Sequence, residues 1–200
     1  ATRISSDFLY QMPLLILVAT GLVLVLAESF VSGRKRGFLM RITVAGCVAA
    51  AIAAAVLYGK LGDQSAMGKG PSYLMGGMLV ADQFAMFFIV LFCGATACTA
   101  LISDHHQREH EWENGEYYAL LALAAAGMAM MAMAGDLVTI FIGIETMSLS
   151  VYVLAASRWR SRRGAEAALK YFLMGAFSTG FLLYGIALVY GATGTTNLHR

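Results

Sequence analysis

Two ionisable residues lie within stretches of sequence that otherwise suit lipid-embedded helices. Glu145 lies in FIGIETMSLSVYVL, residues 141–154, and Lys170 lies in AALKYFLMGAFSTG, residues 167–180. A carboxylate and an amine can each hold or release a proton, and the charge on one changes the proton affinity of the other. This pair of residue types at membrane depth is typical of a proton relay, so Glu145 and Lys170 are the candidate catalytic residues.

The depth of Glu145 shows that its side chain cannot simply reach the membrane surface. Glu145 lies about eight residues from the outer end of its predicted helix and about twelve from Arg158 near the inner end, which is roughly 12 Å and 18 Å at 1.5 Å per residue. A short side chain cannot cover either distance. The alternative to a proton-transfer role is a protonated or hydrogen-bonded acid that fixes the packing of helices.

Lys170 lies closer to the membrane surface than Glu145. Its α-carbon is predicted some 10 Å from the inner face, so its long side chain can extend toward water. Glu166 precedes it by four residues on the same helix face and is a possible partner. The α-carbons of Glu145 and Lys170 differ in predicted depth by roughly 8 Å, which leaves both a direct ion pair and a water-bridged contact open.

Other acidic residues have simpler interpretations. Asp82 and Asp136 stand where predicted spans begin, and an acid there favours a helix N-terminus. Glu28 lies near the inner end of the first span and is predicted to pair with the basic run at 34–36.

The histidines and cysteines do not form a recognisable metal site. His105, His106 and His110 lie in a loop without cysteine, which is predicted to be a solvated inner loop. The three cysteines lack ligand-like spacing and are predicted to be small buried hydrophobic residues: Cys47, Cys93 and Cys98. Because phosphate-loop, haem and iron–sulfur patterns are also absent, we expect no metal and no cofactor in this chain.

The composition indicates a membrane protein. The chain has 200 residues, of which 59% are hydrophobic and 13% are charged, about half the charged share of a typical soluble domain. Its net charge of +2 gives no electrostatic basis for nucleic-acid binding. We therefore predict an all-α fold, a polytopic transmembrane helix bundle.

A helix needs about 20 apolar residues to cross a hydrocarbon layer about 30 Å thick. Six segments qualify, at about 8–31, 38–59, 79–102, 117–134, 137–157 and 165–190. Spans one to three thus occupy residues 1–102, a cytoplasmic loop occupies 103–116, and spans four to six occupy 117–200. Pro13 is expected in the first turn or two of its helix, where a missing N–H costs least. The fourth span is rich in Ala, Gly and Met, so we expect tight packing, with partners that include helices outside this chain.

The basic residues define a topology. Eight lie in alternate connections and Arg41 lies just inside a neighbouring span, whereas the opposite side carries four: Arg3, Lys60, Lys69 and Arg200. The positive-inside rule then places both ends of the chain outside. The first apolar block is long and lacks a small-residue cleavage site, so it is interpreted as a span and not a signal peptide. The chain starts without Met and ends directly after a span, so we expect it to be part of a larger protein.

The sequence from Gly135 to Thr195 resembles the N-subunit family of bacterial proton-pumping NADH:quinone oxidoreductase, complex I. The similarity rests on FIGIE-x-x-SL-x-x-Y, a basic turn, EA-x-LKYF and LLYGIALVYG-x-x-G, and MLVADQFAMFF resembles the family's third span. It covers most of residues 79–195 well, and the first two spans by pattern only.

The resemblance implies an antiporter-like membrane subunit of about fourteen helices with two inverted repeats, of which this chain supplies the first six. Glu145 matches the family's fifth-helix glutamate and Lys170 its sixth-helix lysine. In the family, that glutamate pairs with a lysine on a seventh helix, which this chain does not contain. NADH, FMN, iron–sulfur clusters and quinone are expected in partner subunits, and the other membrane subunits and the lipid bilayer are the expected partners.

One position departs from the family pattern. Members often have Pro where this chain has Ser150, which can still bond a backbone carbonyl and bend the helix weakly. Two rival functions remain open: a subunit of a multi-subunit cation/proton antiporter, and a non-pumping scaffold in which the buried charges only hold helices together.

Overall fold

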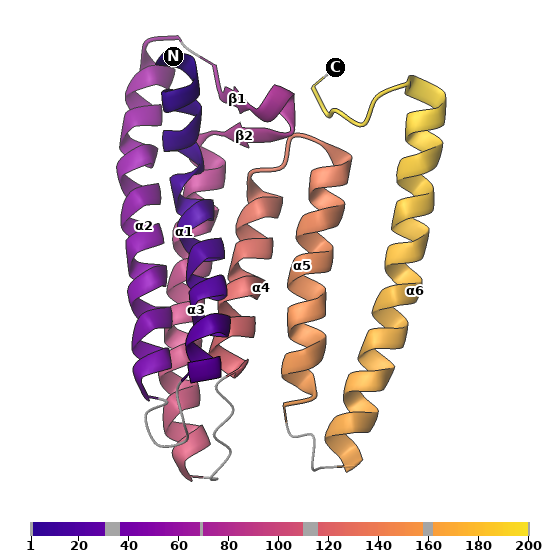
Figure 1. Ribbon diagram of the computed structural model, residues 1–200. Helices are drawn as coiled ribbons and strands as arrows, with labels where there is room; N and C mark the ends of the chain where they lie inside the picture. Colours follow the sequence, from indigo (N-terminus) through magenta and orange to yellow (C-terminus); the bar gives the residue numbers. More distant parts are fainter. Residues whose placement is uncertain (1, 31–36, 69, 110–115, 158–161, 200) are drawn as a thin grey trace.

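Figure 1 shows the computed structural model of the chain, which describes residues 2–30, 37–68, 70–109, 116–157 and 162–199. The side chains of residues 2–6, 105, 106, 108 and 109 are not described either. Six helices follow one another with alternating direction: α1 (Thr2–Phe30), α2 (Gly37–Ala66), α3 (Gln83–Glu109), α4 (Glu116–Ala132), α5 (Leu137–Ala155) and α6 (Arg162–Thr193). The predicted all-α helix bundle is therefore confirmed.

Five of these helices are long and apolar enough to cross a membrane, and α4 is the exception. It has 17 residues, which corresponds to about 25 Å and lies at the lower limit for a span. Eight of its residues are buried, mostly alanines. Its position inside the bundle supports the predicted tight packing of small residues.

A short hairpin corrects the predicted start of the third span. Residues 79–81 were expected to be helical, but they form β2 (Leu79–Ala81), which pairs antiparallel with β1 (Ser72–Leu74). A 3-10 turn at Met75–Gly77 joins the strands, and Gly76 and Gly77 adopt φ values of 72° and 95°, which glycine adopts readily. The Val80 N–H donates to the Met133 carbonyl at 2.7 Å, so a distant backbone group holds β2 extended.

Three other boundaries differ from the prediction. Helix α2 continues to Ala66, and α3 continues to Glu109, so the first half of the predicted 103–116 loop is helical. Helix α1 begins at Thr2, which places Pro13 about three turns inside the helix instead of near its start. Polar residues extend these helices beyond their apolar parts, and a hydropathy pattern does not detect such extensions. The end of the bundle that carries β1 and β2 is called the hairpin end, and the opposite end is called the loop end.

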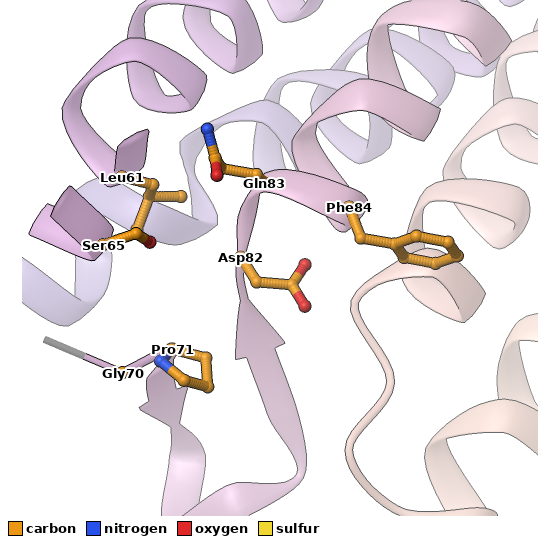
Figure 2. Close-up of a pocket in the computed structure, with 7 residues that line it drawn as sticks. All are labelled: Leu61, Ser65, Gly70, Pro71, Asp82, Gln83 and Phe84. Atoms are coloured by element: carbon orange, nitrogen blue, oxygen red, sulfur yellow. The ribbon is translucent and has the colours of Figure 1, made fainter. Parts of the chain in front are cut away.

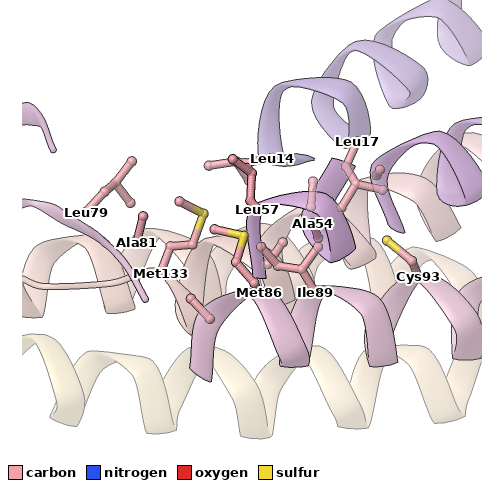
Figure 3. Close-up of a cluster of buried hydrophobic side chains, with 14 of the residues drawn as sticks. Leu14, Leu17, Ala54, Leu57, Leu79, Ala81, Met86, Ile89, Cys93 and Met133 are labelled. Atoms are coloured by element: carbon pink, nitrogen blue, oxygen red, sulfur yellow. The ribbon is translucent and has the colours of Figure 1, made fainter. Parts of the chain in front are cut away.

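The main apolar core lies between α1, α2, α3 and α4, with the hairpin covering one end (Figure 3). Leu17, Met86, Ile89 and Met133 are all fully buried in it. Cys47 and Cys93 also lie in this cluster as free thiols, as predicted. Cys98 does not, because it is exposed on α3, so the prediction that it is buried is wrong.

Helix α6 lies at the edge of the bundle and packs mainly against α5 (Figure 1). Ile186 is its one buried residue. The core therefore fixes α1 to α4 firmly, α5 packs on α4, and α6 is positioned through α5 and through the segment that follows it.

Candidate functional site

Asp136 sets the start of α5 at the hairpin end. Its Oδ1 accepts from the Val138 N–H at 2.8 Å, which confirms the predicted cap, and its Oδ2 accepts from the Thr196 hydroxyl at 2.7 Å. The Leu137 N–H donates to the Thr196 carbonyl at 2.9 Å. Both carboxylate oxygens thus join the start of α5 to the segment beyond α6.

That segment, residues 194–199, forms a strap across the hairpin end of the bundle. Gly194 ends α6 with a φ of 73°. The Leu198 N–H donates to the Gly135 carbonyl at 3.0 Å, and the Asn197 side-chain amide donates to the Gly77 carbonyl at 3.2 Å. The strap fixes the end of α6 relative to α5 and the hairpin.

Glu145 lies near the middle of α5, eight residues after Leu137 and ten before Ala155. Its Oε1 atom is buried and accepts no hydrogen bond from any residue that the structure describes. The central position agrees with the depth predicted from the sequence. A buried carboxylate oxygen without a partner calls for a proton, a water molecule or another group beside it.

Small residues hold this part of α5 close to α4. A Cβ atom added to Gly127 of α4 would lie 2.6 Å from the Met147 N atom and 2.8 Å from the Gly143 carbonyl oxygen. A Cβ atom added to Gly143 would lie 3.0 Å from the Gly127 carbonyl oxygen. The backbones of the two helices therefore touch at positions two residues either side of Glu145, which fixes where its side chain leaves the helix.

Side-chain hydrogen bonds also shape α5 around Glu145. The Thr146 hydroxyl donates to the Ile142 carbonyl and the Ser150 hydroxyl donates to the Thr146 carbonyl, each at 2.8 Å. Ser150 thus makes the backbone contact that the sequence suggested in place of a proline. Such contacts bend a helix slightly without breaking it, and α5 is continuous through both residues.

Lys170 pairs with Glu166, as the four-residue spacing suggested, and both side chains are exposed, at 73% and 63%. The structure shows no direct ion pair between Lys170 and Glu145 within the described part of the chain. The residues of α6 that face α5 include Gly175, and Lys170 is about 140° around the helix axis from it at 3.6 residues per turn. The two candidate catalytic residues are therefore not brought together by these six helices.

Tyr152 is a residue that the sequence argument did not single out. Its side chain is 9% exposed, and its ring lies 4.9 Å from that of Tyr171 at 87° and 5.8 Å from that of Phe172 at 85°. A Cβ atom at Gly175 would overlap the Tyr152 hydroxyl. The sequence could have indicated Tyr152 through its spacing, because it follows Glu145 by seven residues and so lies on the same face of α5.

The other predicted residues lie elsewhere. Asp82 caps α3, because its Oδ1 accepts from the Ala85 N–H at 2.7 Å. The basic residues predicted to pair with Glu28 and the side chains of the loop histidines lie outside the described residues. No group of His, Cys, Asp and Glu in the described ranges has the arrangement of a metal site.

Asp82 also borders a cavity of about 260 Å³ at the hairpin end, between α2 and α3 (Figure 2). The cavity is lined by Leu61, Ser65, Gly70, Pro71, Asp82, Gln83 and Phe84. One oxygen of its single carboxylate is already used as a helix cap. None of the lining residues belongs to α5, so the cavity is separate from the site around Glu145.

Comparison with known protein families supports the resemblance found in the sequence. Residues 134–200 match a family described as NADH:quinone oxidoreductase/Mrp antiporter, transmembrane. NADH-quinone oxidoreductase subunit N of Trichlorobacter lovleyi is 42% identical over 189 residues, which are 94% of this chain and 37% of that protein. Subunit N 1 of Sorangium cellulosum is 40% identical over 191 residues, 93% of this chain and 38% of that protein.

Solved structures of membrane complexes contain chains with the same arrangement of helices as this chain. A chain of respiratory complex I from Thermus thermophilus superposes with a TM-score of 0.75 at 30% identity, covering 94% of this chain and 38% of that one. A chain of the Mrp complex from Dietzia sp. has a TM-score of 0.71 at 21% identity, which shows a shared fold. The predicted resemblance to the N-subunit family is confirmed, and this chain spans less than two fifths of the length of the relatives named above.

Proposed function

We propose that this chain, which is similar to subunit N of NADH-quinone oxidoreductase along nearly its whole length, takes part in proton translocation within complex I. Quinone reduction elsewhere in the complex would drive the translocation. The single observation that carries this proposal is that Oε1 of Glu145, in the middle of α5, is buried and has no hydrogen-bond partner among the described residues. A group so placed can bind and release a proton inside the membrane, which a purely structural carboxylate has no need to do.

Glu145 is the proposed charge-coupling carboxylate. When it gains or loses a proton, the field at neighbouring ionisable groups changes, and this coupling acts equally in both directions. Its direct partner is proposed to lie in the part of the relatives that this chain does not span, because Lys170 is bound to Glu166 here.

Lys170 is the proposed proton-input group on the cytoplasmic side. It lies eight residues after Arg162, near the loop end of α6. A lysine side chain this close to the end of a span can extend toward water at the inner face, and Glu166 provides a counter-charge. Proton transfer from Lys170 to Glu145 would require water or further side chains between them.

The redox steps are assigned to partner subunits. NADH, FMN, iron–sulfur clusters and quinone are proposed to bind there, and no cofactor is assigned to this chain. The proposed location is the bacterial inner membrane, with the hairpin end and both ends of the chain outside. The other membrane subunits of complex I are the proposed neighbours.

The experiment is to measure proton movement in inverted membrane vesicles that contain the full-length protein within its complex. NADH addition should acidify the vesicle interior, and an uncoupler should abolish the signal. Sodium-driven proton exchange without dependence on NADH would support the cation/proton antiporter alternative. Normal pumping by a complex whose Glu145 has been replaced would support the scaffold alternative.

A further inference from the structure

Two buried side-chain oxygens of the described residues lack a hydrogen-bond partner, Thr139 Oγ1 and Glu145 Oε1, both on α5. The face of α5 that carries Glu145 also carries Tyr152, a residue that is 9% exposed. The Tyr152 ring packs on Tyr171 and Phe172 and its hydroxyl lies against Gly175, and these two side chains, Glu145 and Tyr152, are the polar pair of this face. Seven residues separate them, about two helical turns, so both side chains leave α5 on the same side.

The ring of Tyr152 points from the loop end toward the hairpin end. It packs on Tyr171 and Phe172 of α6, whereas its hydroxyl lies against Gly175, three to four residues further toward the hairpin end. This is the direction in which side chains of α5 are expected to lean, since they tilt toward the N-terminus of their helix. The hydroxyl is therefore directed toward the level of Glu145.

The absence of a side chain at Gly175 is what leaves room for the hydroxyl. The Gly175 carbonyl accepts from the Thr179 hydroxyl at 3.1 Å, so a second polar side chain follows along the same surface of α6. The surface between α5 and α6 thus carries polar groups from Tyr152 toward the hairpin end.

Water is the partner that fits both atoms. The α-carbons of Tyr152 and Glu145 are about 10 Å apart along the helix axis. The long tyrosine side chain leans toward the hairpin end, which brings its hydroxyl closer to the level of the carboxylate. A phenol hydroxyl can donate and accept, so it can hold one end of a short water chain that donates to the carboxylate. Buried polar groups without a protein partner are commonly satisfied by such ordered water.

We propose that Tyr152 is a positioning residue for proton transfer at Glu145, whose hydroxyl holds water between α5 and α6 that hydrates the carboxylate. The rings of Tyr171 and Phe172 keep the Tyr152 ring in the orientation this requires. The proposal rests on the proposed function, because it assigns Tyr152 a role in the proton transfer assigned to Glu145.

The test is Tyr152→Phe in the full-length protein within the assembled complex, with Tyr58→Phe on α2 as the matched control, since Tyr58 is 43% exposed and takes no part in the proposed arrangement. Both changes keep the ring and remove one hydroxyl. We expect Tyr152→Phe to assemble normally and to lower the pumping rate roughly 10-fold, less than the loss of a direct acid–base group. Tyr58→Phe should pump like the unaltered complex.

A second readout separates positioning from packing. The infrared band of the protonated Glu145 carboxyl, assigned by its disappearance in Glu145→Gln, should shift in Tyr152→Phe, because a hydrogen bond to the carboxyl is lost. It should stay in place in Tyr58→Phe. Unchanged pumping together with an unshifted band in Tyr152→Phe would overturn the proposal and leave Tyr152 a packing residue.

The outcomes distinguish this proposal from the function it rests on. If Glu145→Gln pumps normally, the proposed function is wrong. If Glu145→Gln stops pumping and Tyr152→Phe changes neither rate nor band, this proposal alone is wrong. Should Tyr152→Phe fail to assemble, 3-fluorotyrosine at position 152 keeps the shape and makes the hydroxyl more acidic. We then expect a changed pH profile of pumping, and an unchanged profile would overturn the proposal.

Discussion

Gly127 and Gly143 bring the backbones of α4 and α5 into direct contact: a Cβ atom on either glycine would lie 2.8 to 3.0 Å from the carbonyl oxygen of the other. The contact lies two residues from Glu145 along α5. Because backbone atoms cannot move aside as a flexible side chain can, this contact determines how α5 presents the carboxylate.

Gly127→Ala is therefore expected to destabilise the protein. The added methyl group would lie 2.6 Å from the Met147 N atom, and overpacking of this kind costs about 1–3 kcal/mol. The thermal midpoint of the purified full-length protein should fall. Gly94→Ala on α3 is the control, since nothing lies within 4 Å of a Cβ atom there. Equal midpoints for the two variants would contradict the close approach of α4 and α5.

Asp136→Ala should loosen the strap as well as the start of α5. It removes the cap on Val138 and the acceptor of the Thr196 hydroxyl, and the cap alone is worth about 1 kcal/mol. Hydrogen exchange should accelerate at the amides of Leu137 and Leu198, which bond across the strap. Asp82→Ala removes the cap of α3 but none of the strap's hydrogen bonds, so it should leave these two amides unchanged. Protection that is unaltered in Asp136→Ala would contradict the role assigned to this carboxylate.

The hairpin end should be accessible from outside the cell. In a full-length protein without its native cysteines, Met67→Cys should react with a membrane-impermeant maleimide applied to intact cells, because Met67 is 74% exposed at that end. Glu116→Cys, at the exposed start of α4 near the loop end, should react only after the membrane is opened. The reverse pattern would show that the positive-inside count gave the wrong orientation.

Lys170→Met should lower proton pumping while leaving the amount of assembled complex unchanged. The ion pair with Glu166 joins two residues of one helix, four apart, and such a pair contributes about 0.2–0.5 kcal/mol, so its loss has little effect on stability. The matched variant Glu166→Gln removes the same ion pair but keeps the amine, and its pumping rate should stay close to normal. If both variants lose pumping equally, the ion pair and not the amine of Lys170 is what matters.

The sequence predicted features that depend on local spacing. Long apolar runs placed all six helices, the acids at 82 and 136 were identified as caps, and the interval between Glu166 and Lys170 indicated a possible ion pair, which the structure contains. Each of these depends on residues within one continuous stretch of the chain.

Features that depend on distant contacts were not predictable in this way. Residues 79–81 are apolar enough for a helix, and it is the hydrogen bond from Val80 to Met133, from another helix end, that keeps them extended. The contact of Tyr152 with Gly175 depends on how α5 and α6 are rotated about their axes, which single-helix periodicity does not specify. The exposure of Cys98 follows likewise from which face of α3 the bundle covers.

The most direct test of the central claim is proton pumping by the complex that carries Glu145→Gln, compared with Glu145→Asp. Glutamine keeps the size of the side chain but cannot release a proton, whereas aspartate keeps the carboxylate. We predict that Glu145→Gln assembles normally and loses pumping by roughly 100-fold, as expected for an essential proton-transfer group, and that Glu145→Asp retains part of it. Pumping and NADH–quinone turnover at normal rates in an assembled Glu145→Gln complex would contradict the account.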